Sequence, residues 1–171
     1  MSARYGERVA HIELRELHDD DLDAIFEMMR DRDAVKMAAF TASDPDDRTA
    51  FDTWISRERS SPDVELFVVT ERGGFAGTAA VFTVEGEREV TCWIAHHAWG
   101  RGVASEVLRL ITAREPIRPL FARAAADDVA WIAVLEKDGF TEVSRAWSYA
   151  PGLGREVEEV LLTLLPALDG A

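Results

Sequence analysis

The sequence predicts one α/β domain built on a mixed β-sheet, and two patterns lead to this fold class. Between residues 64 and 95, three strand-like segments follow one another through short glycine-bearing turns, which is typical of antiparallel neighbours. Farther along, the strand patterns at 89–95 and 120–125 are separated by an amphipathic helix, so they should be parallel and joined by a right-handed crossover. A length of 171 residues with 47% hydrophobic residues suits a single domain, residues 1–171.

The N-terminal part reads as a strand followed by a helix. Partial alternation of apolar and polar residues predicts a strand within residues 9–17. Asp19 to Asp21 follow where a helix start favours acidic residues, and an apolar stripe of helical spacing then runs to about residue 32. Residues 33–40 either continue this helix or form a short second one. The three aspartates also resemble a metal site, but a capped helix start accounts for them.

Strands and helices then succeed one another to the C-terminus. The further helices have apolar faces at Phe51, Trp54 and Ile55, at Val103, Val107, Leu110 and Ile111, and at Ile132 and Leu135. The strand patterns lie at residues 64–70, 75–84, 89–95, 120–125, 140–143 and 157–165. Residues 147–154, which contain a proline and two glycines, read as a loop. The predicted order is β-α-α-β-β-β-α-β-α-β-β, one mixed sheet with helices on both faces.

Composition narrows the class of protein. The net charge of −13 argues against nucleic acid and against an anionic membrane as partners, and it fits a cationic substrate. No apolar run approaches the roughly 18 residues of a membrane span, and the N-terminus lacks the apolar segment of a secretory signal, so we expect a cytoplasmic protein. A single cysteine, Cys92, excludes an internal disulfide and a cysteine-built metal site.

One stretch has the properties of a phosphate site. A strand, a tight loop with Gly100 and Gly102, and the start of a helix follow one another. The free N–H groups of the first helical turn and the helix dipole favour an anion there. Glycine allows the backbone to approach a ligand closely. A tight connection without a ligand is the alternative.

Two motifs resemble the GNAT superfamily of acyl-CoA-dependent N-acetyltransferases, in particular the branch of the ribosomal-protein-alanine acetyltransferases. The first is the acetyl-CoA signature Q/R-x-x-G-x-G/A, which here reads Trp99-Gly-Arg-Gly102-Val-Ala104. The second is N-x-x-S-x-x-V-L-E-K-x-G-F, which here reads Asp128-Val-Ala-Trp131-Ile-Ala-Val-Leu-Glu-Lys137-Asp-Gly-Phe140. Asn is replaced by Asp128 and Ser by Trp131. The resemblance covers nearly the whole chain.

The resemblance implies a fold, a cofactor and a site. The strands at 89–95 and 120–125 should splay apart, and pantetheine should lie between them. Acetyl-CoA is then the co-substrate and no metal is involved. The implied cofactor-binding residues are Ile94, Ala95, Gly100, Arg101, Gly102, Val103, Ala104, Ser105 and Asp128. Arg101 either contacts the phosphates or is simply solvated. The implied partner is an amine, either a protein N-terminus or a small molecule, and a homodimer is compatible with the sequence.

Three residues are candidates for the general base. Glu89 stands where the branch often carries a glutamate, and its alternative is a plain exposed strand residue. His96 and His97 follow the end of the strand, and imidazole titrates near neutrality. Their alternative is a loop histidine that packs on Trp99. Cys92 is a small buried residue or, less simply, a nucleophile.

Two functions therefore remain. The first is an N-acetyltransferase in which a neutral amine attacks the thioester directly. The second is an acyl-CoA-binding protein of the same fold with weak or no turnover. The second follows from the changes at Asp128 and Trp131, since the resemblance implies that the replaced serine protonates the leaving thiolate, which a tryptophan cannot do.

Overall fold

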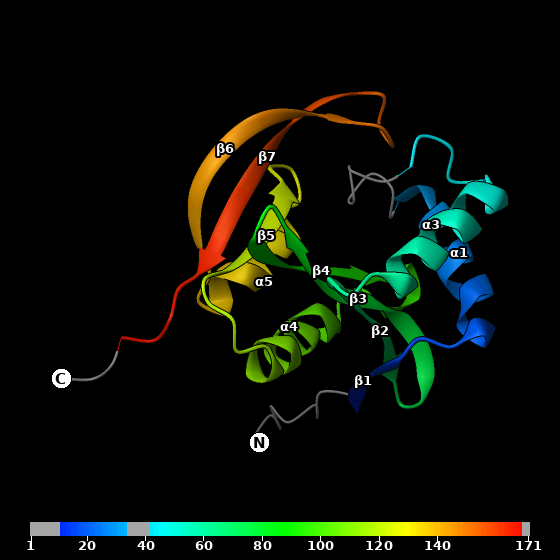
Figure 1. Ribbon diagram of the computed structural model, residues 1–171, viewed down its shortest axis with the longest axis horizontal. Helices are drawn as coiled ribbons and strands as arrows, with labels where there is room; N and C mark the ends of the chain where they lie inside the picture. The colour runs from blue at the N-terminus through cyan, green and yellow to red at the C-terminus, as the bar shows by residue number, and fades with distance from the viewer. Residues whose placement is uncertain (1–10, 34–41, 169–171) are drawn as a thin grey trace, which may run out of the picture.

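The computed structural model describes residues 11–33 and 42–168, which form one seven-stranded sheet with helices on both faces (Figure 1). The strands are β1 (Ile12–Glu16), β2 (Val64–Glu71), β3 (Gly74–Val84), β4 (Glu87–Ile94), β5 (Leu120–Ala125), β6 (Thr141–Ala150) and β7 (Arg155–Leu164). The helices are α1 (Leu22–Arg30), α3 (Arg48–Ser60), α4 (Val103–Arg114) and α5 (Val129–Lys137), with short 3-10 turns at Asp19–Asp21 and His96–Ala98. This succession confirms the predicted order, while the prediction for residues 34–40 lies outside the described residues.

The sheet is mixed, as predicted. Its strand order is β1-β2-β3-β4-β5-β7-β6, and β4 and β5 form the parallel pair among antiparallel neighbours. The two hairpin turns before β3 and β4 each place two residues at positive φ, Arg72-Gly73 and Glu85-Gly86. Such two-residue turns match the twist of antiparallel strands. Because the second turn is this short, β4 begins at Glu87, two residues before the predicted start.

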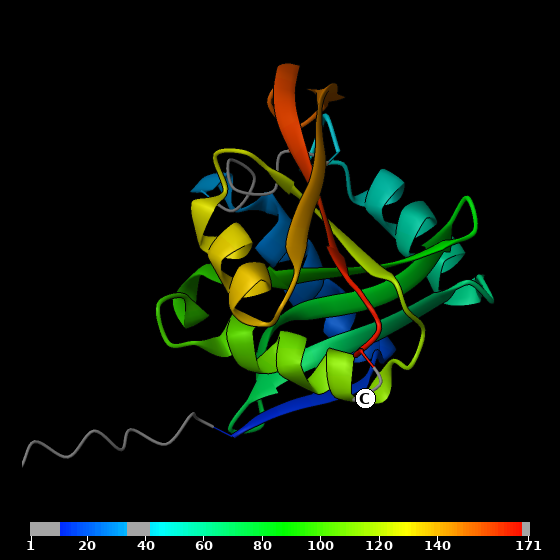
Figure 2. The same cartoon turned by 90° about the vertical axis from the view of Figure 1, so that its left-hand side faces the viewer.

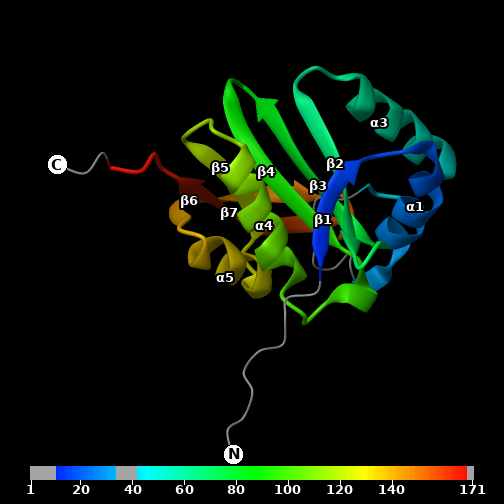
Figure 3. The ribbon, with the colours of Figure 1, turned by 90° about the horizontal axis from the view of Figure 1, so that it is seen from below.

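Each face of the sheet has its own layer of helices (Figure 3). On one face, α1 and α3 bury apolar side chains against β2 and the end of β4, chiefly Ile25, Phe26, Phe51, Ile55 and Val68. On the other face, α4 and α5 pack on β3, β4, β5 and β7, chiefly through Val107, Leu108, Ile111, Leu135, Val90 and Leu120. None of the helices in the described part of the chain is long and apolar enough to cross a bilayer.

β4 and β5 are neighbours over a very short length. Their register consists of Arg88 opposite Leu120 and Glu89 opposite Phe121. Beyond these pairs β5 continues alongside β7 and β4 continues alongside β3. The parallel crossover pair is thus present, and its two strands diverge as expected.

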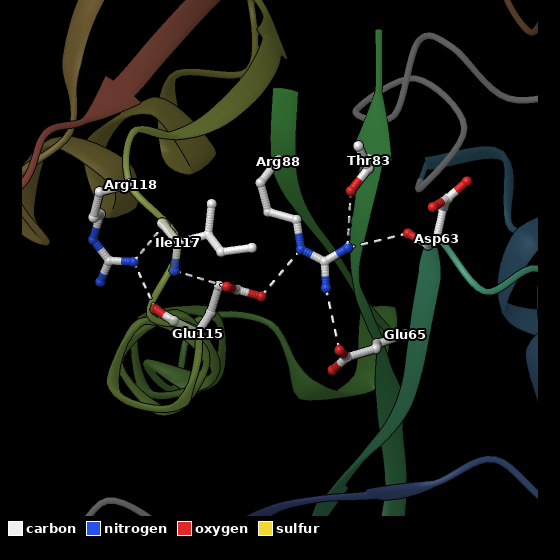
Figure 4. A network of polar contacts seen from close by, with 7 residues as sticks. All are labelled: Asp63, Glu65, Thr83, Arg88, Glu115, Ile117 and Arg118. Carbon is white, nitrogen blue, oxygen red and sulfur yellow. Dashed lines mark hydrogen bonds and ion pairs between the residues drawn. The ribbon is translucent and has the colours of Figure 1, made fainter. Parts of the chain in front are cut away.

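A polar network holds the paired end of β4 and β5 (Figure 4). Arg88 Nε donates to Glu115 Oε2 at 3.1 Å, and the two side chains are only 10% and 7% exposed. The same guanidinium donates to the Asp63 carbonyl, the Thr83 hydroxyl and the Glu65 carboxylate. The Glu115 carboxylate also accepts the main-chain N–H of Ile117, and Arg118 donates to the carbonyls of Glu115 and Ile117. The network ties the end of α4 and the chain before β5 to β2, β3 and β4.

The C-terminal hairpin differs from the prediction. Residues 147–150 belong to β6 instead of a loop, and the turn is confined to residues 151–154. The prediction was wrong because β6 is an edge strand whose residues 141–147 are all exposed, so no apolar alternation marks it. The β6–β7 hairpin stands out from the rest of the sheet (Figure 2) and arches over toward the side where α1 and α3 lie (Figure 1).

Candidate functional site

The divergence of β4 from β5 exposes main-chain groups of β4. Ala95 N–H donates to the Ala76 carbonyl of β3 at 2.8 Å. Because antiparallel residues alternate between facing the partner and facing away, the N–H groups of Ile94 and Cys92 point away from β3, toward the diverging β5. The carbonyl of Ile94 fits this alternation, since it accepts the indole N–H of Trp99 at 2.8 Å. The Ile94 N–H therefore faces the space between the strands, whereas the Ala95 N–H donates to β3 and its carbonyl already accepts Ala98 N–H.

Gly77 fixes the position of this part of β4. It lies opposite Ile94 on β3 with φ +155°, a value that residues with side chains rarely adopt. A Cβ atom there would lie 2.2 Å from the Trp93 carbonyl oxygen and 3.0 Å from Ile94 Cα. The two strands approach each other closely only because this residue is glycine.

The loop after β4 presents its backbone to open space. Gly100 and Gly102 have φ of +74° and +73°, and Gly102 is the N-cap residue of α4. A Cβ atom at either glycine would meet nothing within 4 Å. The first N–H groups of α4 have no acceptor within the helix, and the helix dipole adds partial positive charge. These properties fit the phosphates of a nucleotide-like cofactor.

The other residues predicted to bind the cofactor surround this loop. Val103 is 3% exposed and anchors the first turn of α4 in the core, while Ala104 and Ser105 are half-buried beside it. Arg101 is not simply solvated, and its guanidinium would have to leave its present partners to contact an anion in the loop. Its guanidinium lies 2.8 Å from a Glu71 carboxylate oxygen and donates to the His97 carbonyl at 3.0 Å.

Glu89 lies at the last residue pair before β4 and β5 diverge. It is 4% exposed, so the alternative of an exposed strand residue is wrong. Its carboxylate accepts Arg123 Nε from β5 at 3.0 Å, and Arg123 Nη1 donates to Glu159 of β7 at 3.1 Å. Sequence reasoning missed Arg123 and Glu159, although a lone arginine in the apolar strand Leu120–Ala125 was a usable signal.

The two histidines follow β4 in the 3-10 turn His96–Ala98. The His96 ring stacks on Trp99 with centroids 4.2 Å apart, and its Nδ1 lies 3.3 Å from Asp31 Oδ2. The ligand atoms of His96, Asp31 and Asp33 lie within 4.8 Å of one another, which would suit a shared cation or simply orient the imidazole. No spacing in the sequence indicates this group, because Asp31 and His96 are 65 residues apart in the chain. His97 Nε2 lies 3.0 Å from the Phe75 carbonyl.

The start of α5 contains both departures from the second motif. The Asp128 carboxylate accepts Trp131 N–H at 3.2 Å and caps the helix, as expected. Burial raises the pKa of the Asp128 carboxyl above its usual range, and the hydrogen bond to Trp131 N–H offsets part of that effect. The Trp131 indole N–H donates to the Arg123 carbonyl at 3.3 Å, so α5 is bonded to the strand that carries the guanidinium.

Cys92 has the environment of a structural residue. Its side chain packs against the core formed with α4, and burial raises the pKa of its thiol to about 12. A thiol with this pKa is almost entirely protonated near neutral pH, so Cys92 lacks the thiolate that a nucleophile needs.

Solved structures with the same fold are acetyltransferases. The spermidine N-acetyltransferase from Vibrio cholerae, solved with CoA and spermine, matches with a TM-score of 0.77 at 16% identity, over 90% of this chain and 95% of that one. The ribosomal-protein-alanine N-acetyltransferase from Brucella melitensis matches with 0.73 at 21%, over 90% and 99%. An N-acetyltransferase from Staphylococcus aureus matches with 0.75 at 20%, over 91% and 99%. A search of curated protein sequences found no match.

These neighbours include enzymes with different acceptors, so the ribosomal-protein-alanine branch is not distinguished from the others. The family itself is shown by sequence. Residues 11–141 match the model of the acetyltransferase (GNAT) domain, which agrees with the diverging strands and the glycine loop. The chain belongs to the GNAT acetyltransferase family.

Proposed function

We propose that this protein is an acetyl-CoA-dependent N-acetyltransferase that acetylates a primary amine. One observation carries the proposal: β4 and β5 part after two residue pairs, and the glycine loop and the start of α4 stand at the end of β4. This arrangement offers main-chain N–H groups along the gap and an anion site at its end. A long, thin donor with a pyrophosphate group matches both.

In this proposal the loop from Gly100 to Ala104 and the first turn of α4, including Val103 and Ser105, hold the pyrophosphate through backbone N–H groups. Arg101 reaches the phosphates only by leaving Glu71. Ile94 bonds the pantetheine chain along β4, with Ala95 beside it. Asp128, at the start of α5, is the unfavourable neighbour, because an ionised carboxylate would repel the donor's phosphates.

Acetyl-CoA would supply an activated acetyl group to a neutral amine. The amine nitrogen attacks the thioester carbon, the C–N bond forms, the C–S bond breaks, and the proton lost by nitrogen balances the thiolate that leaves. Main-chain N–H groups of Ile94 and Cys92 face the gap and are placed to stabilise the charge that develops on the carbonyl oxygen. Holding both reactants in line contributes on the order of 7–11 kcal/mol in ideal cases.

Glu89 is the general base that the geometry favours. Its carboxylate is enclosed at the point where the strands diverge, and Arg123 occupies only one of its oxygens in the described structure. In this proposal the other oxygen accepts the amine proton, directly or through water. His96 is the second candidate, held by Asp31 and Trp99, and His97 is the third. The thiolate leaves without a strong acid, since a thiol pKa is about 8.5.

The proposal is tested by supplying acetyl-CoA and a panel of primary amines to the purified protein and measuring loss of the thioester. Glu89→Gln should lower kcat by about 10²–10⁴-fold if Glu89 is the base. Glu87→Gln is the matched control, because Glu87 is an exposed residue on the same strand. A Gly102→Trp change should abolish the rise in melting temperature that acetyl-CoA produces. Absence of that rise in the unmodified protein would contradict donor binding.

A second function is favoured by the start of α5. Trp131 replaces a serine, and Asp128, whose half-buried carboxylate caps α5, replaces an asparagine. A protein that keeps acyl-CoA binding without useful turnover would show the acetyl-CoA-dependent rise in melting temperature and no thioester loss with any amine. Turnover with any amine above the uncatalysed rate would rule this function out.

A further inference from the structure

Glu89, Arg123 and Glu159 form an ion-pair triad that spans three strands. Glu89 comes from β4, Arg123 from β5 and Glu159 from β7. The three side chains point to the same face of the sheet, because Val90, Ala122 and Val160, their neighbours in sequence, point to the opposite face and pack with α4 and α5. The triad therefore lies on the face where α1 and α3 are placed, and the β6–β7 hairpin arches toward that side (Figure 1).

The charges of the triad do not balance. The Glu89 and Glu159 side chains are 6% and 13% exposed, whereas the Arg123 side chain is 43% exposed. Two enclosed carboxylates thus share one guanidinium that is half in solvent, which leaves a net charge of −1. Enclosed charge is costly unless it is paired, so this group attracts a further cation.

The triad also stands beside the proposed reaction centre. Glu89 is the last paired residue before β4 and β5 diverge, and Glu159 is reached through the same guanidinium. An amine whose nitrogen approaches Glu89 would bring the rest of the molecule toward Glu159.

We propose that Glu159 binds a second cationic group of the acceptor, so that the preferred acceptor is a diamine or polyamine, and that Arg123 competes with this group. The inference rests on the proposed acetyltransferase function. Glu159 is a specificity residue in this scheme, and Arg123 sets how strongly the carboxylate attracts the acceptor. A purely structural role, in which the triad only ties β5 to its neighbours, is the alternative.

The test compares two matched acceptors, 1,4-diaminobutane and 4-amino-1-butanol, in the full-length protein with saturating acetyl-CoA. Both carry one primary amine that can react, and only the first carries a second ammonium. The quantity measured is the ratio of their kcat/KM values. We expect the diamine to be preferred, and Glu159→Gln to lower the ratio about tenfold, the usual size of one charge-assisted contact. Arg123→Gln should raise the ratio.

Glu158→Gln is the control, because Glu158 lies on the same strand, is also ion-paired, and points to the other face, toward Arg145. Its ratio should equal that of the unmodified protein. A ratio near one in the unmodified protein, or the same ratio in Glu159→Gln, would overturn the inference. If Arg123→Gln does not fold, the Glu159 variant still decides.

Failure of the proposed acetyltransferase function can be distinguished from failure of the inference about Glu159. If no amine is acetylated while acetyl-CoA still raises the melting temperature, catalysis is absent and binding remains to be measured. Calorimetric titration of 1,4-diaminobutane into the protein with CoA then tests the triad directly. Binding that Glu159→Gln weakens about tenfold supports it, and equal binding in both proteins overturns it.

Discussion

Replacing Gly77 by alanine is the sharpest test of how β4 is positioned. The added Cβ would lie 2.2 Å from the Trp93 carbonyl oxygen. Carbon and oxygen approach each other to about 3.3 Å at closest in strand contacts, so the backbones must separate by about 1 Å. β4 has little room to move away, because Trp93 packs with the α1 and α3 side chains while Ile94 packs with those of α4.

Overpacking of this kind costs about 1–3 kcal/mol, and the unfavourable φ of Gly77 adds about 1 kcal/mol. We therefore expect Gly77→Ala to destabilise the protein by about 3 kcal/mol, which for a chain of this size lowers Tm by about 6–12 °C. The assay is thermal and urea unfolding followed by circular dichroism. The rise in Tm with acetyl-CoA should also shrink, since Ile94 is displaced.

Gly86→Ala is the matched control. Gly86 has φ +82° in an exposed hairpin turn, and a Cβ atom there would meet nothing within 4 Å. Gly86→Ala therefore has the free-energy cost of a positive φ but no steric clash. If the two variants unfold within about 2 °C of each other, the close approach of β3 to β4 does not constrain the site and the reasoning fails.

Three further predictions follow from the burial of charged and titratable groups. Arg88→Met should lower the free energy of unfolding in urea by about 3 kcal/mol, because it leaves Glu115 enclosed without its cation. Adding Glu115→Gln should restore part of this loss. An unchanged urea midpoint in Arg88→Met would contradict the prediction. Asp128→Asn should raise Tm at pH 7. The pKa of the Asp128 carboxyl is higher in the folded protein than in the unfolded chain, so the stability that its neutral form contributes is fully present below the unfolded pKa and is lost as pH rises through the folded pKa. Asparagine stays neutral and does not have this loss. The melting curves of Asp128→Asn and the unmodified protein should converge near pH 3, and a difference that grows on acidification would be the wrong sign. Cys92, whose pKa is raised to about 12, should resist iodoacetamide at pH 8 in the folded protein and react readily in urea.

The order of elements could be predicted because each signal is local. Apolar alternation, helical spacing, glycine turns and the Asp128 cap all act within a few residues, and the structure has each of them. The predicted strand at residues 140–143 was shorter than β6, because an exposed edge strand has no apolar alternation that would mark its full length.

The site could be predicted only in part. The tight turn at Gly100 and Gly102 could be predicted, because glycine adopts the positive φ that both residues have. The ion pair of Glu89 could not be predicted, because its partner Arg123 is 34 residues away in the chain and comes into contact only when β4 and β5 pair. The contact between Arg101 and Glu71 likewise depends on tertiary structure, and no spacing in the sequence indicates it.

The short pairing of β4 with β5 has a consequence for cooperativity. Strands β1 to β4 form one half of the sheet and β5 to β7 the other, and their main-chain pairing is just two residue pairs long. Among the described residues, α4, the Arg88 network and the Glu89–Arg123 ion pair add to the connection between the halves. A donor that bonds along β4 would supply part of the missing ladder. Binding of the donor would then stabilise the contact between the two halves of the sheet. Amide hydrogen exchange in β4 and in β5 should therefore slow together when the donor binds.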